Sequence, residues 1–175
     1  MLILSPCGKE SIIINDMNKM KQTAETTEGP YYKANSPEKT ILREKGVPGE
    51  KLTLTGYVND TNGKPAPGAW LDFWQADGNG KYDNAGYVLR GHQFSDQSGK
   101  YKVETVLPGG YTGRTPHIHV KVRSPDKRLT ITTQLFVPGL ATNKTDSIFR
   151  EDLVMDISDV PGGKSASFNF VLDLP

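Results

Sequence analysis

Two histidines separated by one residue, His117-Ile118-His119, form the pattern in this chain that is best suited to chemistry. In an extended strand, successive side chains point to opposite faces, so both imidazoles lie on one face. Each neutral imidazole offers a ring-nitrogen lone pair to a transition metal without adding charge. The pattern therefore predicts part of a metal site that other residues must complete.

The remaining ligands of such a site must be oxygen donors, because the chain has only three histidines and one cysteine. A tyrosine ligand must lose a proton with a pKa near 10, which favours a trivalent ion such as Fe(III). Tyr82 and Tyr111 each follow glycine-rich turns where functional groups tend to gather. Two phenolates and a hydroxide would neutralise Fe(III) and avoid a buried net charge. Spacing alone does not select these two tyrosines from the seven present.

The composition of the chain limits which classes of protein it can belong to. A chain of 175 residues is long enough for one domain with a buried core. Its 21 basic residues balance 20 acidic ones, which argues against nucleic acid as a partner. Eighteen glycines and twelve prolines fit a fold of many short strands and turns. No apolar run reaches the roughly 18 residues of a transmembrane segment.

The single cysteine, Cys7, rules out an intrachain disulfide framework. Its setting, Leu4-Ser5-Pro6-Cys7-Gly8, resembles the end of a lipoprotein signal. The apolar stretch before it is short, however, and proline is unfavourable just before a cleavage site. The expected location is the cytoplasm. An extracytoplasmic lipoprotein anchored through Cys7 is the alternative, and it requires a signal upstream of the given start.

The chain divides into an irregular N-terminal arm, residues 1–50, and a domain of short strands, residues 51–175. From Lys51 onward, alternating runs are separated by turn signals about every ten residues, which predicts an all-β sandwich of short antiparallel strands. Residues 93–95 and 101–106 are expected to pair as a hairpin, and residues 147–154 to form one short helix. The other expected strands are 52–58, 69–75, 116–123, 130–137 and 167–172.

Several motifs occur in a characteristic order over roughly residues 27–140. They include Asp72-Phe-Trp-Gln-Ala-Asp77, Gly80-Lys-Tyr82, Leu107-Pro-Gly-Gly-Tyr111 and Arg114-Thr-Pro-His-Ile-His119. This ordered set resembles the intradiol ring-cleavage dioxygenases, the family of catechol 1,2-dioxygenases and protocatechuate 3,4-dioxygenases. The set is specific because it ends in Arg-x-x-His-x-His, whereas its first strand motif is shared by many β-sandwich modules.

The resemblance implies a site and a reaction. The iron ligands would be Tyr82, Tyr111, His117 and His119, with Fe(III) as cofactor. The substrates would be a catechol and O2, and cleavage between the two hydroxyl-bearing carbons would give a muconate-type diacid. Tyr111 would be the ligand that leaves and accepts a catechol proton. The resemblance also implies that Arg114 stabilises charge on the ring, and that a glutamine, Gln134, holds this arginine or orients the substrate.

Some features depart from the catechol-type members. Only the irregular arm precedes the core, where those members have a helical dimerisation segment, and the segment from Tyr111 to His117 is short. Substrate and assembly therefore stay open. The arm is suited to wrapping the core or contacting another subunit, so a homo-oligomer is one expectation. A carboxylated catechol would need a cation beyond Arg114, for which Arg90 and Lys33 are candidates.

Two other function classes compete with this interpretation. A non-catalytic, transthyretin-like β-sandwich binding module explains the strand motifs equally well. It gives no reason for two tyrosines, two histidines and an arginine to occur in this order. A zinc hydrolase would use His117 and His119 with a carboxylate such as Asp77 or Asp96.

Overall fold

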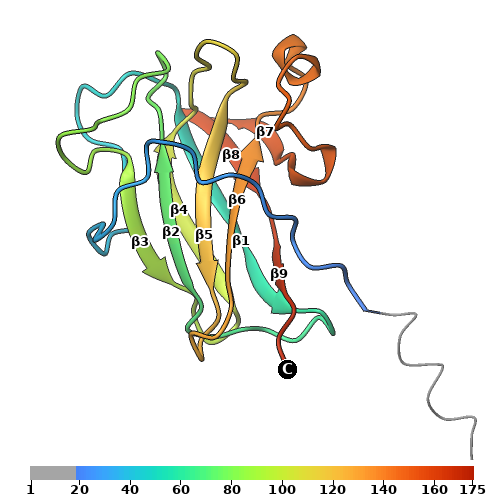
Figure 1. The fold of residues 1–175 in the computed structure, drawn as a ribbon. Coiled ribbons are helices and arrows are strands. Elements are labelled where there is room, and N and C mark those ends of the chain that lie inside the picture. The colour runs from blue at the N-terminus through green and yellow to red at the C-terminus, as the bar shows by residue number, and fades with distance from the viewer. Residues whose placement is uncertain (1–18) are drawn as a thin grey trace, which may run out of the picture.

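The computed structural model describes residues 19–175, which form two β-sheets packed face to face (Figure 1). One sheet has the strand order β4-β1-β8-β7, with β9 paired to β1, and the other has the order β3-β2-β5-β6. The all-β sandwich is therefore confirmed. The strands are β1 (Lys51–Asp60), β2 (Trp70–Gln75), β3 (Arg90–Phe94), β4 (Lys100–Val106), β5 (His117–Arg123), β6 (Thr130–Phe136), β7 (Asp156–Val160), β8 (Gly163–Ser167) and β9 (Phe170–Leu172).

The core lies between the two sheets and follows the period of two in the sequence. On β5 the side chains of Ile118, Val120 and Val122 are buried against the opposite sheet, and the residues between them face outward. The same alternation supplies the core from the other strands, including Leu52, Leu54, Val58, Leu71, Phe73, Val103, Ile131 and Leu135. Consequently, His117 and His119 project from the outer face of the β3-β2-β5-β6 sheet.

The predicted hairpin of residues 93–106 is wrong. The turn is present, because the Gly99 N–H donates to the Asp96 carbonyl at 2.9 Å. The two flanking strands nevertheless belong to different sheets, since β3 pairs with β2 and β4 pairs with β1. Gln93 Oε1 accepts the backbone N–H of Lys102 at 3.2 Å. The turn predicted at residues 96–99 is therefore present, but each flanking strand pairs with a strand that is distant in the sequence.

Two further expectations need correction. Strands β8 and β9 run parallel to β1, so their sheet is mixed where only antiparallel pairing was expected. The single helix expected at residues 147–154 is also wrong. The chain forms two short 3-10 helices instead, η1 (Ala141–Lys144) and η2 (Glu151–Leu153).

The described part of the arm, residues 19–50, crosses the outer face of the β3-β2-β5-β6 sheet (Figure 1). Asp72, on the outward face of β2, anchors it. Ser36 Oγ donates to Asp72 Oδ1 at 2.6 Å, and the Tyr32 hydroxyl donates to Asp72 Oδ2 at 3.2 Å. The Thr26 N–H also donates to the carbonyl of Thr132 on β6 at 2.8 Å. The arm thus covers the sheet face that carries the two histidines.

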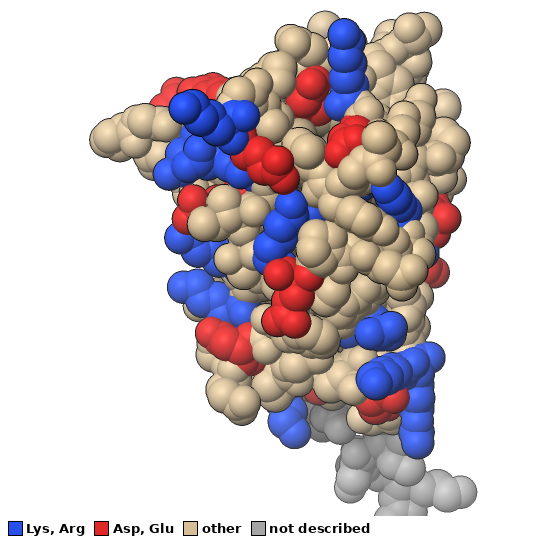
Figure 2. Space-filling view, turned by 90° about the vertical axis from the view of Figure 1, so that its left-hand side faces the viewer, with Lys and Arg blue, Asp and Glu red and all other residues tan. Residues whose placement is uncertain are grey.

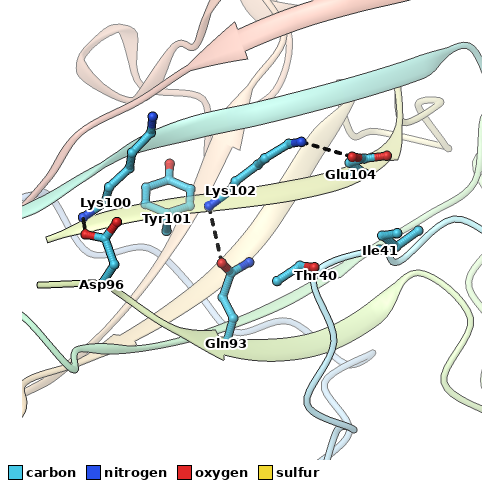
Figure 3. A pocket seen from close by; sticks show the side chains of 8 residues that line it. All are labelled: Thr40, Ile41, Gln93, Asp96, Lys100, Tyr101, Lys102 and Glu104. Atoms are coloured by element: carbon cyan, nitrogen blue, oxygen red, sulfur yellow. Dashed lines mark hydrogen bonds and ion pairs between the residues drawn. The ribbon is translucent and has the colours of Figure 1, made fainter. Parts of the chain in front are cut away.

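Farther along, the arm bridges the edges of the two sheets. The Lys39 N–H donates to the His92 carbonyl on β3, and the Leu42 N–H donates to the Glu104 carbonyl on β4. A cavity of about 260 Å³ lies at this seam and contains none of the predicted ligands (Figure 3). Figure 2 shows the same side of the molecule, where basic and acidic side chains are interspersed over the described surface.

Within residues 19–175 no helix is long and apolar enough to cross a membrane. Cys7, on which the lipoprotein alternative rests, lies outside the described residues.

Candidate metal centre

His117 and His119 lie at the beginning of β5 and are almost completely buried, with 2% and 1% of their surface exposed. Their Nε2 atoms are 3.1 Å apart. The His117 Nδ1 atom is 2.6 Å from the Thr115 carbonyl, so this nitrogen carries the proton and Nε2 keeps its lone pair. Two nitrogens bound to one metal at about 2.0–2.1 Å, at right angles, would be separated by about 3 Å. The pair therefore fits two ligands of one ion.

Both imidazoles are neutral at physiological pH. Burial lowers the pKa of His117 to about 4, against the opposing effect of its hydrogen bond to Thr115. Burial also lowers the pKa of His119 far below its ordinary value, and the neighbouring His117 adds to this effect. A neutral imidazole is the form that binds a metal.

Tyr82 and Tyr111 complete a ring of four side chains around one space. The Tyr82 and Tyr111 ring centroids are 5.9 Å apart, Tyr111 is 5.8 Å from His117, and Tyr82 is 6.3 Å from His119. The Tyr82 hydroxyl is buried and has no hydrogen-bond partner within residues 19–175. Burial, together with the nearby Tyr111 phenol, raises the pKa of Tyr82 above its ordinary value. A strongly charged cation would be needed to hold this phenol as phenolate.

Close contact between two glycine-rich loops positions the tyrosines. A Cβ atom on Gly80 would lie 2.3 Å from the Gly110 carbonyl oxygen, and one on Gly109 would lie 2.7 Å from the Gly80 nitrogen. Only residues without a side chain permit this approach. The loops meet at the end of the sandwich where β5 begins (Figure 1). The glycines that precede Tyr82 and Tyr111 are thus the physical reason why these residues, distant in sequence, lie together.

Arg114 and Gln134 lie beside this group. The Arg114 Nη2 atom donates to Gln134 Oε1, and Gln134 Nε2 donates to the Thr27 carbonyl of the arm at 2.8 Å. Gln134 therefore holds the arginine. The positive charge of Arg114 acts on the four-residue group, since it contributes to lowering the pKa of His119 and offsets part of the rise at Tyr82.

Two aromatic residues outside the predicted ligand set contact its members. The Tyr31 ring of the arm stacks on Tyr82, with 4.3 Å between centroids and 17° between planes. The Trp74 ring stacks on His119 at 4.7 Å and 10°. Trp74 alternates with Asp72 on the outward face of β2, and this alternation was the available signal that it does not belong to the core.

Asp146 is another residue that sequence reasoning missed. Its Oδ2 atom accepts a hydrogen bond from Arg114 Nε at 3.0 Å. No motif or spacing in the sequence marks this aspartate, which lies 32 residues beyond its partner in an irregular segment. Only the tertiary structure reveals it.

A cavity of about 620 Å³ opens beside the tyrosines, large enough for an aromatic ring and its substituents. Arg90 and Lys33, the candidate cations for a carboxylated substrate, do not line it. Arg90 donates to the Tyr31 carbonyl at 2.6 Å, and Lys33 donates to the Ala85 carbonyl at 2.7 Å. The cavity is lined by Tyr31, Gly80, Lys81, Tyr82, Asn84, Tyr111 and Thr112.

The carboxylates of the zinc-hydrolase alternative are engaged elsewhere. Asp77 Oδ1 accepts the backbone N–H groups of Asn79 and Lys81, and Asp96 Oδ1 caps its own turn in the same way. In the part of the chain that is described, no three His, Cys, Asp or Glu side chains come together as a metal site. The oxygen donors near the histidine pair are therefore the two phenols.

Comparison with known proteins identifies relatives of this chain. The profile of a family described as "Dioxygenase" matches residues 27–174. The hydroxyquinol 1,2-dioxygenase of Nocardioides simplex is 30% identical over 180 aligned positions, which cover 88% of this chain and 61% of that protein. The catechol 1,2-dioxygenase of Acinetobacter baylyi is 32% identical over 165 positions, which cover 77% and 53%.

One solved structure matches over most of the length of both chains. It is the dioxygenase domain of a dioxygenase–carbohydrate-binding protein fusion from Streptomyces sp. SirexAA-E, with 44% identity and a TM-score of 0.85. The match covers 89% of this chain and 100% of that domain. By contrast, the chain spans only a little over half the length of the two curated relatives, the hydroxyquinol and catechol dioxygenases. The sequence match and the shared fold together place the chain in the intradiol ring-cleavage dioxygenase family.

Proposed function

We propose that this protein is a non-haem Fe(III) dioxygenase that cleaves a catechol between its hydroxyl-bearing carbons with O2, giving a muconate-type diacid. The observation that carries the proposal is the convergence of two neutral imidazoles and two phenols in a chain of this family. Tyr82, Tyr111, His117 and His119 would hold the iron.

Bound Fe(III) would supply a trivalent Lewis acid that stabilises phenolate and catecholate oxygens and makes the catechol ring reactive toward O2. The donor set suits this ion. The buried Tyr82 phenol resists ionisation, so a strongly charged partner is required. The two imidazoles add no charge, and two phenolates offset most of the charge of a trivalent ion.

Tyr111 is the residue that we assign to proton transfer. It is half-buried at the cavity beside Tyr82, where a catechol hydroxyl would enter. Its phenolate oxygen would accept a proton from that hydroxyl, and Tyr111 would become a neutral phenol. Tyr82, stacked beneath Tyr31, would keep its place together with both histidines.

The remaining side chains orient the substrate and shape its surroundings. The Arg114 guanidinium, held by Gln134, would stabilise negative charge that develops on the substrate ring. Tyr31 and Trp74 cover Tyr82 and His119 with aromatic surface, which keeps water away from these ligands.

The binding-module alternative gives no role to this convergence of buried donors. The printed names of the relatives differ in the substituents of the ring, as in catechol, hydroxyquinol and chlorocatechol. The substrate of this chain is therefore proposed only as a catechol. Its cytoplasmic location and a homo-oligomeric assembly stay predictions.

Metal analysis, visible spectroscopy and oxygen uptake of the purified protein test the proposal together. We expect iron, a tyrosinate-to-Fe(III) charge-transfer band that colours the protein red-brown, and uptake of O2 with at least one member of a panel of catechol, hydroxyquinol, chlorocatechol and protocatechuate. A colourless protein that stays inactive after loading with Fe(III) would contradict it. Zinc-dependent hydrolysis without oxygen uptake would support the hydrolase instead.

A further inference from the structure

Asp146 lies in the segment that follows η1, and its carboxylate is buried against the residues that precede β5. Its side chain has no exposed surface. Asp146 Oδ2 accepts hydrogen bonds from Arg114 Nε at 3.0 Å and from the Thr115 N–H at 2.9 Å. Asp146 Oδ1 accepts the Ile148 N–H at 2.9 Å. One carboxylate thus contacts two consecutive residues, Arg114 and Thr115, immediately before β5.

The first contact sets the position of the arginine. Asp146 holds Nε of Arg114, and Gln134 holds Nη2. These two bonds fix the plane of the guanidinium from two directions, because its donors have a rigid geometry. They leave Nη1 without a partner within residues 19–175. The arginine side chain is only 15% exposed, so the guanidinium is held largely out of solvent.

The second contact sets the position of a histidine. The Thr115 N–H is bound to Asp146, and the Thr115 carbonyl accepts the Nδ1 proton of His117. The Thr115 hydroxyl also contacts the side chains of Thr142 and Asn143 at 2.8 and 2.5 Å. The segment around Asp146 therefore fixes the peptide that orients the His117 ring.

We propose that Asp146 is a positioning residue. It fixes the Arg114 guanidinium and the Thr115–His117 hydrogen bond relative to each other. This inference rests on the proposed function, because it assigns Arg114 to the substrate and His117 to the metal. Asp146 acts through these two neighbours and does not contact the reacting atoms. A purely structural aspartate would affect folding alone, whereas a positioning residue affects turnover through Arg114.

A double-mutant cycle separates these two roles. Asp146→Asn keeps an acceptor for a backbone N–H and removes the charge that holds Arg114. We expect kcat/KM for the preferred catechol to fall about 10–100-fold, as for other residues that orient a metal ligand. Arg114→Ala should cause a loss at least as large. The double variant should then lose no more than Arg114→Ala alone.

The matched control is Asp126→Asn. Asp126 also accepts a backbone N–H, from Arg128 at 3.1 Å, at the opposite end of the β5–β6 hairpin. This variant should retain the wild-type kcat/KM. Independent, multiplicative losses in the double variant, or full activity of Asp146→Asn, would overturn the proposal.

Hydrogen exchange in the metal-free protein gives a second readout that requires neither activity nor iron. The Arg114 Nε–H signal, assigned in the NMR spectrum by its loss in Arg114→Lys, should exchange slowly in the wild-type protein. It should exchange rapidly in Asp146→Asn. An Arg114 signal that exchanges in the wild type as fast as that of Arg128, whose side chain is 82% exposed, would refute the positioning role even if Asp146→Asn does not fold. Slow exchange in a protein that cleaves no catechol would refute the proposed function and leave the Asp146–Arg114 bond established.

Discussion

The indole of Trp74 lies almost parallel to the imidazole of His119, with 10° between the planes and 4.7 Å between the centroids. The contact arises because residues 74 and 119 are direct partners in the β2–β5 ladder. The indole is buried, and its Nε1 atom has no hydrogen-bond partner within residues 19–175. Trp74 therefore restrains the histidine through its ring face alone.

Replacing this ring tests that restraint. In Trp74→Phe no hydrogen bond is lost, so we expect the free energy of unfolding to fall by only about 1–2 kcal/mol. The smaller ring covers less of His119, so iron should be released to a chelator about 10-fold faster. Trp70→Phe is the control, because Trp70 lies on the same face of β2 and contacts Arg123. Equal release rates from the two variants would contradict the proposed contact effect.

The two tyrosines are expected to differ in their effect on the metal. Tyr111→Phe should retain some iron, since three protein ligands remain, and should shift the visible band. Tyr82→Phe should abolish the band. Tyr57→Phe, which alters a 42% exposed tyrosine on β1, should leave both iron content and spectrum unchanged. Complete loss of iron from a folded Tyr111→Phe protein would argue against its role as the ligand that leaves.

The stability of the metal-free protein should depend on pH through His117. Its pKa is about 4 in the folded chain, below the ordinary value of 6.5. The unfolded chain therefore binds a proton more readily, and stability should fall as the pH drops from about 6.5 to 4. The difference corresponds to about 3 kcal/mol. Chemical denaturation at several pH values should show a smaller fall for His117→Gln, and identical slopes would count against a buried neutral imidazole.

The glycine contact between the two loops can be tested with a pair of alanine variants. Gly80 and Gly113 have nearly the same positive φ, 78° and 76°, so alanine should cause similar backbone strain of about 1 kcal/mol at both positions. Only at Gly80 would the new Cβ meet another backbone atom, the Gly110 carbonyl oxygen. We expect Gly80→Ala to lose a further 1–3 kcal/mol or so, and to bind less iron. Equal melting temperatures and iron contents would contradict this prediction.

The sequence by itself determined the class of fold and the placement of the two histidines on one face of a strand. Both depend on the period of two in a strand, which is a local property of the backbone. It also determined that any ligands beyond the histidines carry oxygen, because the chain has too few other histidines and cysteines. The choice of Tyr82 and Tyr111 required the order of motifs in a known family.

Only the tertiary structure decided which strands pair and which residues surround the site. The turn at Asp96 was visible in the sequence, but its strands separate into two sheets because each finds its partners far away in the chain. Tyr31 and Asp146 reach the site from segments without a regular pattern. Their positions follow from packing and hydrogen bonds over long separations, and no local periodicity encodes such contacts.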